Sequence, residues 1–284
     1  CMMYPRLALL REFLRDDGAI FVSIADHEGH NLRMILDEVF GPANFVATIV
    51  WQKKQSPQND AIYLSDMHEY VLVYARNAKQ SRDDPRGWSR NLLQRSEEAN
   101  DRYKNPDNDS RGPWTAADFT CNKTRSERPN LYYSITNPHT GDEVLPSERR
   151  VWLMDSTASK ELLRDKRLWW GASGRNFPRL KKFLSEVAAG IVPSTWWTRD
   201  FAGDNQEGRR ELREIFTAKE MDFATPKPTK LIRRVLEIAT EKDSLVMDSF
   251  AGSGTTGHTV SALNRDDGGT RRCILVEIDP EISR

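Results

Sequence analysis

A glycine-rich loop between an apolar strand and a helix is the feature that most constrains the fold of this 284-residue chain. Leu245-Val246-Met247 predicts a short buried strand, and the pattern Gly252-x-Gly254-x-x-Gly257 follows it and opens a helix over Thr255–Leu263. A second apolar strand, 273–276, ends in Glu277, which follows the last of these glycines by 20 residues. This spacing matches the dinucleotide fingerprint, in which the acid binds ribose hydroxyls. The pattern therefore predicts an α/β unit that binds an adenosine-containing cofactor.

Asp248, the residue that ends the first of these strands, narrows the choice of cofactor. A pyrophosphate binds best to free helix N–H groups with no anion nearby. A carboxylate beside the loop repels phosphates and suits a cation instead. Because S-adenosylmethionine carries a sulfonium and an ammonium group and has no phosphate, Asp248 favours this cofactor over NAD or FAD.

The first region, residues 1–78, has the pattern of a buried α/β sheet. A helix over 6–15 precedes the continuous apolar run Ala19–Ile24, which is typical of a strand buried on both faces. A second helix begins at Asp26 and is stopped by Gly41-Pro42. Two further strands are expected over Phe45–Trp51 and Tyr70–Tyr74. Between them, Lys53–Asp60 is polar and is expected to form a mobile loop. This order is typical of half of an open, doubly wound sheet.

The middle region, residues 79–205, is broken by Pro and Gly at short intervals. A strand over Leu131–Ile135 and one helix around Arg179–Val187 are the regular elements that the sequence predicts there. The last region, 206–284, returns to α/β, with helices over Gly208–Phe216 and Lys230–Thr240 before the glycine loop. We therefore expect an inserted, irregular α+β domain between two halves of one sheet.

The charge is unevenly distributed, although 42 basic and 42 acidic residues give a net charge of zero. Net charge is −3 over 1–78, +5 over 79–200 and −2 over 201–284, and seven of the eight tryptophans lie in the basic stretch. Basic residues among aromatic rings suit phosphates and stacked bases. The alternative is a Trp-rich core with solvated Arg and Lys around it, since Trp is usually buried.

The cofactor loop resembles that of a known enzyme family. Asp248-Ser249-Phe250-Ala251-Gly252-Ser253-Gly254-Thr255-Thr256 is similar to the D-x-F-x-G-S-G-T-T loop of amino-methylating DNA methyltransferases. Pro226-Lys227-Pro228 before a helix resembles the segment that precedes this loop in the family. The order of the segments resembles the circularly permuted members, in which the catalytic half comes first, the target-recognition domain second and the cofactor half last. The chain resembles the modification subunits of type III restriction systems and similar adenine-specific methyltransferases. This resemblance implies a site-specific DNA methyltransferase of a restriction-modification system, which transfers a methyl group from S-adenosylmethionine to adenine N6 in duplex DNA.

The resemblance implies a Rossmann-like methyltransferase sheet and roles for individual residues. Phe250, Gly252, Gly254 and Thr255 would line S-adenosylmethionine, with Asp248 near its methionine end and Glu277 on its ribose. Lys227 and Pro228 would close over the methionyl part. The residues expected near the target base are Asp26, Glu28 and Tyr70 or Tyr74. The target would be a base flipped out of double-stranded DNA.

One element of the family pattern, the catalytic tetrapeptide D/N-P-P-Y/F, does not occur in this sequence. The nearest strings lack the second proline: Asp84-Pro85-Arg86, Asn105-Pro106-Asp107 and Asn137-Pro138-His139. The tetrapeptide matters because an exocyclic amine is a poor nucleophile, and acceptors must hold it in line with the methyl group. In the permuted order the tetrapeptide would precede Cys1. We therefore expect a fragment that does not methylate alone.

Three other functions stay open at this point: an N4-cytosine methyltransferase, an NAD- or FAD-dependent oxidoreductase, and a non-catalytic DNA-specificity subunit. The resemblance further implies a restriction subunit and a second modification subunit as partners. No apolar run approaches the roughly 18 residues of a membrane span, so we expect no membrane contact and a cytoplasmic location. We also expect no metal site, because His27-x-x-His30 offers only two ligands.

Overall fold

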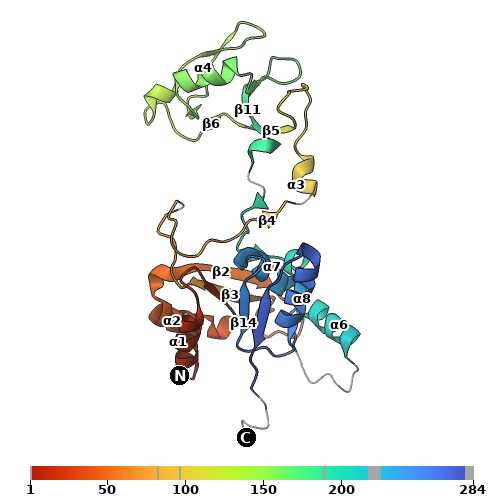
Figure 1. Ribbon diagram of the computed structural model, residues 1–284. Coiled ribbons are helices and arrows are strands. Elements are labelled where there is room, and N and C mark those ends of the chain that lie inside the picture. The colour runs from red at the N-terminus through yellow and green to blue at the C-terminus, as the bar shows by residue number, and fades with distance from the viewer. Residues whose placement is uncertain (1, 82, 96, 188–189, 217–224, 279–284) are drawn as a thin grey trace. The chain divides into compact units, whose positions relative to one another are not determined.

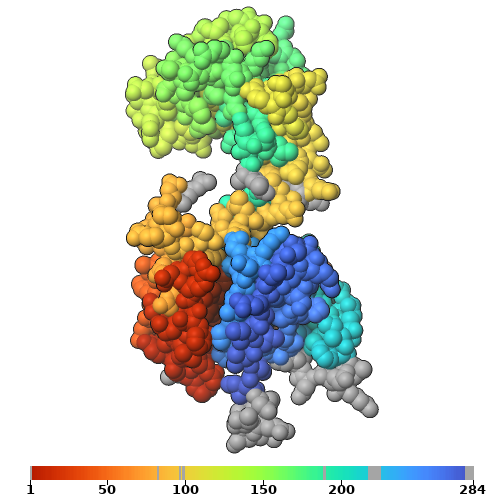
Figure 2. All heavy atoms as spheres, viewed as in Figure 1, coloured from red at the N-terminus to blue at the C-terminus, as the bar shows by residue number. Residues whose placement is uncertain are grey.

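The computed structural model describes the chain except for residues 1, 82, 96, 188–189, 217–224 and 279–284. The chain divides into two compact units: unit 1 comprises residues 1–93 and 192–284, and unit 2 comprises residues 94–191. Residues from both ends of the sequence therefore build unit 1, where Figure 2 shows the red and blue residues side by side. Unit 2 lies within the stretch 79–205 that the sequence separates by its Pro and Gly content.

The larger sheet of unit 1 has four strands in the order β1-β3-β2-β13. They span Ala19–Ile24, His68–Ala75, Phe45–Gln52 and Trp196–Trp197 in that order. β3 runs antiparallel to both β1 and β2, so β1 and β2 point the same way and end at the same edge. β13 is parallel to β2 and follows unit 2 in the sequence. The expected strands of the first region are therefore present.

Helices cover both faces of this sheet because the side chains of β3 alternate. Leu72 and Tyr74 pack under α1 (Met3–Phe13) and α2 (Asp26–Phe40), in one core that includes Leu36. Val71 and Val73 point to the opposite face. There they share a core with residues of α5 (Arg199–Ala202) and α7 (Thr229–Ala239). Figure 1 shows α1 and α2 together beside this sheet.

The second sheet of unit 1 contains β14 (Leu245–Asp248) and β15 (Arg272–Leu275), which are parallel. α8 (Thr255–Asp267) connects them, which gives the β-loop-α-β unit that the sequence predicts. α7 and α8 pack against one face through a small core around Leu236, Val260 and Leu263 (Figure 1). The remaining elements of unit 1 are η1 (Pro42–Asn44) and α6 (Asn205–Ile215). The chain is thus a mixed α/β protein.

Unit 2 consists of short strands and one longer helix. Its elements are α3 (Glu97–Asp101), β5 (Trp114–Asp118), β6 (Thr120–Cys121), η2 (Pro129–Leu131), β7 (Ile135–Thr136), β8 (Glu143–Val144), β9 (Val151–Trp152), α4 (Ser156–Arg164), β10 (Leu168–Trp169), β11 (Arg179–Phe183) and η3 (Leu184–Glu186). β4 (Leu93–Gln94) and β12 (Gly190–Ile191) lie where the chain passes between the units. The largest sheet has the order β10-β11-β5.

Two sequence predictions for unit 2 are wrong. Residues 179–187 form strand β11 and a 3-10 turn instead of a helix, because β11 pairs with β10 on one side and β5 on the other. Its charged Lys181 is buried and bonded to Asp107 and Asp109, which disguised the alternation of a strand. Of the strand expected over 131–135, only Ile135 lies in a strand, β7, and Leu131 belongs to η2 instead.

The tryptophans of unit 2 are mostly core residues. Trp114, Trp152 and Trp170 are buried, and Trp152 packs with Phe119 and Leu180 in the main core of this unit. This arrangement supports the core interpretation of the Trp-rich stretch over one in which these rings stack on bases. In the part of the chain that the structure describes, no helix is long and apolar enough to cross a membrane.

Candidate functional site

The glycine loop turns sharply from β14 into α8, and two glycines make this turn possible. Gly252 has φ 51° and Gly254 has φ 75°, both in the left-handed region that favours glycine. A Cβ atom added at Gly254 would meet nothing within 4 Å, so the loop is open at this point. Gly257, in contrast, lies against the sheet, and a Cβ atom there would come within 2.9 Å of a methyl carbon of Leu275. The three glycines thus allow the turn, leave the loop open at Gly254 and let α8 pack closely on β15.

Asp248 holds the two ends of the loop together. One carboxylate oxygen accepts a hydrogen bond from the backbone N–H of Phe250 at 3.2 Å, and the other accepts one from the Thr256 hydroxyl at 2.5 Å. The carboxylate also affects Cys273 on the neighbouring strand: burial, and then the charge of Asp248, raise the pKa of this thiol. The site is therefore anionic and keeps its thiol neutral.

Glu277 lies at the same loop. Its carboxylate accepts a hydrogen bond from the backbone N–H of Gly252 at 2.5 Å, across 25 residues of sequence. The backbone N–H of Ala251 donates to the Val276 carbonyl at 3.0 Å and fastens the loop to the end of β15. Because a carboxylate oxygen accepts more than one hydrogen bond, Glu277 retains the capacity to bind ligand hydroxyls.

Phe250 provides an exposed aromatic ring on the loop. The Arg6 guanidinium of α1 lies 5.7 Å from the centre of this ring. An exposed ring, an open glycine turn and two carboxylates are the groups that a positively charged nucleoside needs. The residues present therefore fit S-adenosylmethionine by the chemistry of their donors and acceptors.

Lys227 and Pro228 connect the loop to the four-stranded sheet. The Lys227 carbonyl accepts a hydrogen bond from the Thr255 hydroxyl at 3.2 Å, and the Lys227 ammonium binds the Glu69 carboxylate at the start of β3. That ammonium also lies 4.8 Å from the centre of the Trp51 ring. Pro228 is buried and begins α7 as its N-terminal cap.

This connection continues to Lys53, which sequence reasoning missed as a site residue. The Lys53 ammonium lies 2.5 Å from the Asp66 carboxylate and 3.5 Å from that of Glu69. Its side chain is 7% exposed, so the expectation that this residue belongs to a polar, mobile loop is wrong at its first position. The sequence feature that could have indicated this role is a charged residue directly after an apolar strand. We call Asp66, Lys53, Glu69 and Lys227 the charged bridge.

Asp26 and Tyr70, two of the three residues expected near the target base, come together. Tyr70 is paired with Ile24 in the sheet, and Asp26 follows that strand. Burial, and then the hydrogen bond to Asp26, raise the pKa of the Tyr70 hydroxyl, so it stays protonated at neutral pH. The His68 ring nitrogen lies 3.2 Å from the same hydroxyl.

Glu28 and Tyr74 lie in different surroundings. The Glu28 carboxylate accepts a hydrogen bond from the Asn31 side chain at 3.0 Å on α2. Tyr74 is fully buried and donates a hydrogen bond to Asp37 at 2.6 Å. Among the residues that the structure describes, no group of three His, Cys, Asp or Glu side chains could hold a metal ion.

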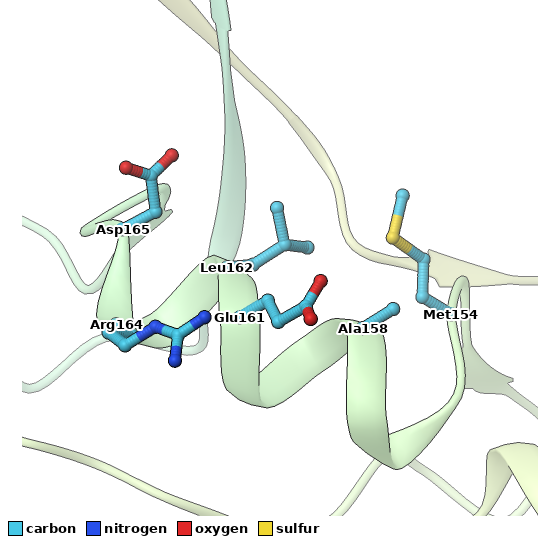
Figure 3. Close-up of a pocket in the computed structure, with 6 residues that line it drawn as sticks. All are labelled: Met154, Ala158, Glu161, Leu162, Arg164 and Asp165. Carbon is cyan, nitrogen blue, oxygen red and sulfur yellow. The ribbon is translucent and has the colours of Figure 1, made fainter.

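A separate pocket of about 580 Å³ lies in unit 2 on α4. Figure 3 shows the residues that line it: Met154, Ala158, Glu161, Leu162, Arg164 and Asp165. None of the residues expected to bind cofactor or target base is among them. The candidate cofactor site is thus an open loop on unit 1, and this pocket is a different feature.

The chain belongs to a family of DNA-modifying enzymes. A family model described as DNA methylase matches residues 2–284. Among individual proteins, the Mod subunit of the type III restriction-modification enzyme StyLTI from Salmonella typhimurium is 35% identical over 283 residues, which cover 99% of this chain and 40% of that subunit. The EcoPI Mod subunit from Escherichia phage P1 is 31% identical and covers 99% of this chain and 45% of that subunit. The resemblance inferred from the loop is confirmed.

Two further matches are more distant. The type II methyltransferase M.KpnI from Klebsiella pneumoniae is 29% identical and covers 99% of this chain and 67% of that enzyme. A solved structure, the M1.HpyAVI-SAM complex, is 13% identical with a TM-score of 0.38 over 98% of this chain and 77% of the other. The chain spans less than half the length of the two Mod subunits.

Proposed function

We propose that this chain forms the S-adenosylmethionine-binding and DNA-binding part of a methyltransferase that modifies the N6 amine of adenine in duplex DNA. The observation that carries the proposal is the pair of carboxylates, Asp248 and Glu277, hydrogen-bonded to the open glycine loop. S-adenosylmethionine fits this pair, because it could place its cationic groups beside Asp248 and its ribose hydroxyls beside Glu277. Membership of the DNA methylase family supports DNA as the substrate.

In this proposal the loop binds the cofactor and the segment before α7 holds the loop. Phe250 and the peptide groups of Gly252, Gly254 and Thr255 contact the nucleoside and methionine parts. When bound, S-adenosylmethionine supplies an electrophilic methyl group. Lys227, with Pro228 beside it, keeps the loop next to β3 through its bond to Glu69.

The target base is proposed to lie near Asp26 and Tyr70. Tyr70 stays protonated and is flanked by a carboxylate and by His68, so its hydroxyl has fixed partners. Such a group can orient a flipped-out base without changing charge. Glu28, at the start of α2, is the third residue of this group, and its carboxylate accepts a hydrogen bond from Asn31.

The order of the elements supports a circularly permuted methyltransferase with an inserted recognition domain over 79–205. β1 to β3 precede the insert, and the cofactor loop follows it. Since two relatives are Mod subunits of type III restriction-modification enzymes, we propose a restriction subunit and a second modification subunit as partners. We propose a cytoplasmic location for this assembly.

We further propose that the 284-residue chain does not methylate DNA alone, because its sequence has no D/N-P-P-Y/F tetrapeptide. That tetrapeptide supplies the acceptors that hold the amine in line with the methyl group. A methyl-transfer assay on duplex DNA with this chain is expected to give no product. Detectable product would contradict this part of the proposal. In a protein that contains this chain together with such a tetrapeptide, N4-methylcytosine in place of N6-methyladenine would favour the cytosine alternative.

Calorimetry tests the cofactor site itself. S-adenosylmethionine is expected to bind, and NAD is not. Asp248→Asn removes the negative charge and should weaken S-adenosylmethionine binding roughly ten- to hundredfold, the usual worth of a hydrogen bond to a charged group. Asp243→Asn is the matched control, because this exposed acid lies before β14 and away from the loop.

Tight NAD binding without a response to the methyl donor would overturn the proposal in favour of an oxidoreductase. DNA binding without any cofactor binding would favour a specificity subunit.

A further inference from the structure

Three consecutive large apolar residues project from unit 1 between β2 and β3. Ile62, Tyr63 and Leu64 are 88%, 92% and 90% exposed. A single exposed apolar side chain is ordinary on a protein surface, such as Met34 on α2. Three adjacent side chains that bury almost none of their area cannot contribute to the folded core. We call residues 62–64 the apolar finger.

The base of the apolar finger is held in place by hydrogen bonds. The backbone N–H of Gln58 donates to the Ser65 hydroxyl at 2.7 Å, and the backbone N–H of Lys53 donates to the Met67 carbonyl at 3.0 Å. Asp66, next to the finger, forms an ion pair with Lys53. The finger is therefore presented by a closed loop whose two sides are joined beneath it.

The loop lies at the edge of the sheet where the proposed site is found. It follows the end of β2, and β1 ends at the same edge, where Asp26 and Tyr70 meet. The charged bridge connects the loop to the cofactor site: Asp66 binds Lys53, which contacts Glu69, and Glu69 binds Lys227. The Lys227 carbonyl in turn accepts a hydrogen bond from Thr255 of the glycine loop.

The shape and surroundings of the finger favour duplex DNA over a protein partner. A stable protein interface buries about 800 Å² on each side and has a broad apolar centre. Here only three large apolar residues, preceded by Ala61, stand between polar segments, with Gln58, Asn59 and Asp60 on one side and Ser65 and Asp66 on the other. Ile and Leu are typical of the wedges that proteins insert between base pairs.

We propose that the apolar finger inserts into duplex DNA beside the target base and occupies the space that the base leaves when it flips out. This inference rests on the proposed function. Extrusion of a base costs stacking energy, and an apolar wedge offsets part of that cost by stacking on the bases that remain. The charged bridge would keep the finger in register with the cofactor loop, so that the extruded base arrives at the methyl donor.

The test compares two DNA duplexes, one intact and one with a single abasic site, by fluorescence anisotropy at one fixed salt concentration. The wild-type chain should bind the abasic duplex more tightly, because no base has to be extruded. The triple variant Ile62→Ser, Tyr63→Ser, Leu64→Ser should lose about tenfold in affinity for the abasic duplex, as expected when a stacking side chain is removed. The variant should keep the thermal midpoint of the wild type, since these side chains pack on nothing.

The matched control is Leu9→Ser with Met34→Ser, two exposed apolar residues on α1 and α2. It should bind both duplexes as the wild type does. Equal binding by the finger variant and the wild type would overturn the inference, and so would an equal loss by the finger variant and the control variant. A change in self-association of the finger variant, measured by sedimentation without DNA, would assign the finger to a protein interface instead. If the wild-type chain bound S-adenosylmethionine but neither duplex, the proposed function would fail together with the inference.

Discussion

The four-stranded sheet and the two-stranded sheet of unit 1 differ in how completely they are covered. Helices pack on both faces of the four-stranded sheet, and residues 71–75 of β3 are all buried. The two-stranded sheet has α7 and α8 on one face, while Leu245, Met247 and Ile274 are exposed on its strands. Parallel strands in α/β proteins are normally buried on both faces.

Because of this difference, one sheet supplies most of the core of unit 1 and the other carries the candidate site. Most of the buried apolar residues of unit 1 lie in the two cores beside the four-stranded sheet, whereas the two-stranded sheet carries the glycine loop and both of its carboxylates. Segments with few buried apolar contacts open at lower free energy than the core. The glycine loop is thus attached to the sheet with fewer buried apolar residues and connected to the other sheet through the charged bridge.

A pair of identical substitutions tests the contrast most strongly. Leu72→Ala removes a side chain that is 3% exposed on β3, and we expect it to lower the free energy of unfolding by about 2–5 kcal/mol. Leu245→Ala on β14, where the side chain is 57% exposed, should cost less than about 1 kcal/mol. Urea unfolding followed by tryptophan fluorescence measures both. Equal costs would show that the two sheets are equally buried and would break the comparison.

Removal of one hydroxyl group at each sheet tests, with a smaller expected effect, whether a residue serves stability alone or cofactor binding as well. Tyr74→Phe and Thr256→Val each remove a hydroxyl that donates to a carboxylate, Asp37 in the first case and Asp248 in the second. Each should cost about 1–3 kcal/mol of stability, the usual range for a hydrogen bond to a charged group. Only Thr256→Val should also weaken S-adenosylmethionine binding in calorimetry, because only its partner belongs to the proposed site. A binding loss in Tyr74→Phe would contradict this division.

The smallest expected effect is on the reactivity of a thiol. Burial and the charge of Asp248 raise the pKa of Cys273, so this residue stays a neutral thiol above the ordinary thiol pKa of about 8.5. Since the thiolate is the nucleophile, alkylation should accelerate at a higher pH than for a free cysteine. Peptide-resolved mass spectrometry gives the profile. Asp248→Asn should move the profile to lower pH, and an unchanged profile would contradict the contribution of the carboxylate.

Much of the fold and part of the site could be predicted from the sequence. Asp248, Gly252 and Glu277 come together because one β-loop-α-β unit brings them to the same end of adjacent strands, and that geometry is local. The contact between Lys227 and Glu69 joins residues 158 positions apart, and no spacing rule predicts which acid a given lysine will meet. The same reason explains the error at β11, where the buried Lys181 is neutralised by Asp107 and Asp109 from another segment.

The sequence by itself determined the chemistry of the glycine loop, because the glycines of the turn, an acid at each strand end and the apolar strands are properties of neighbouring residues. It also determined that helices and strands alternate in the two end regions. Only the tertiary structure decided that Lys53 is buried, that Asp26 meets Tyr70, and that Ile62, Tyr63 and Leu64 find no place in the core. The physical reason is that burial and charge pairing depend on which distant segments pack together, and local sequence does not encode that choice.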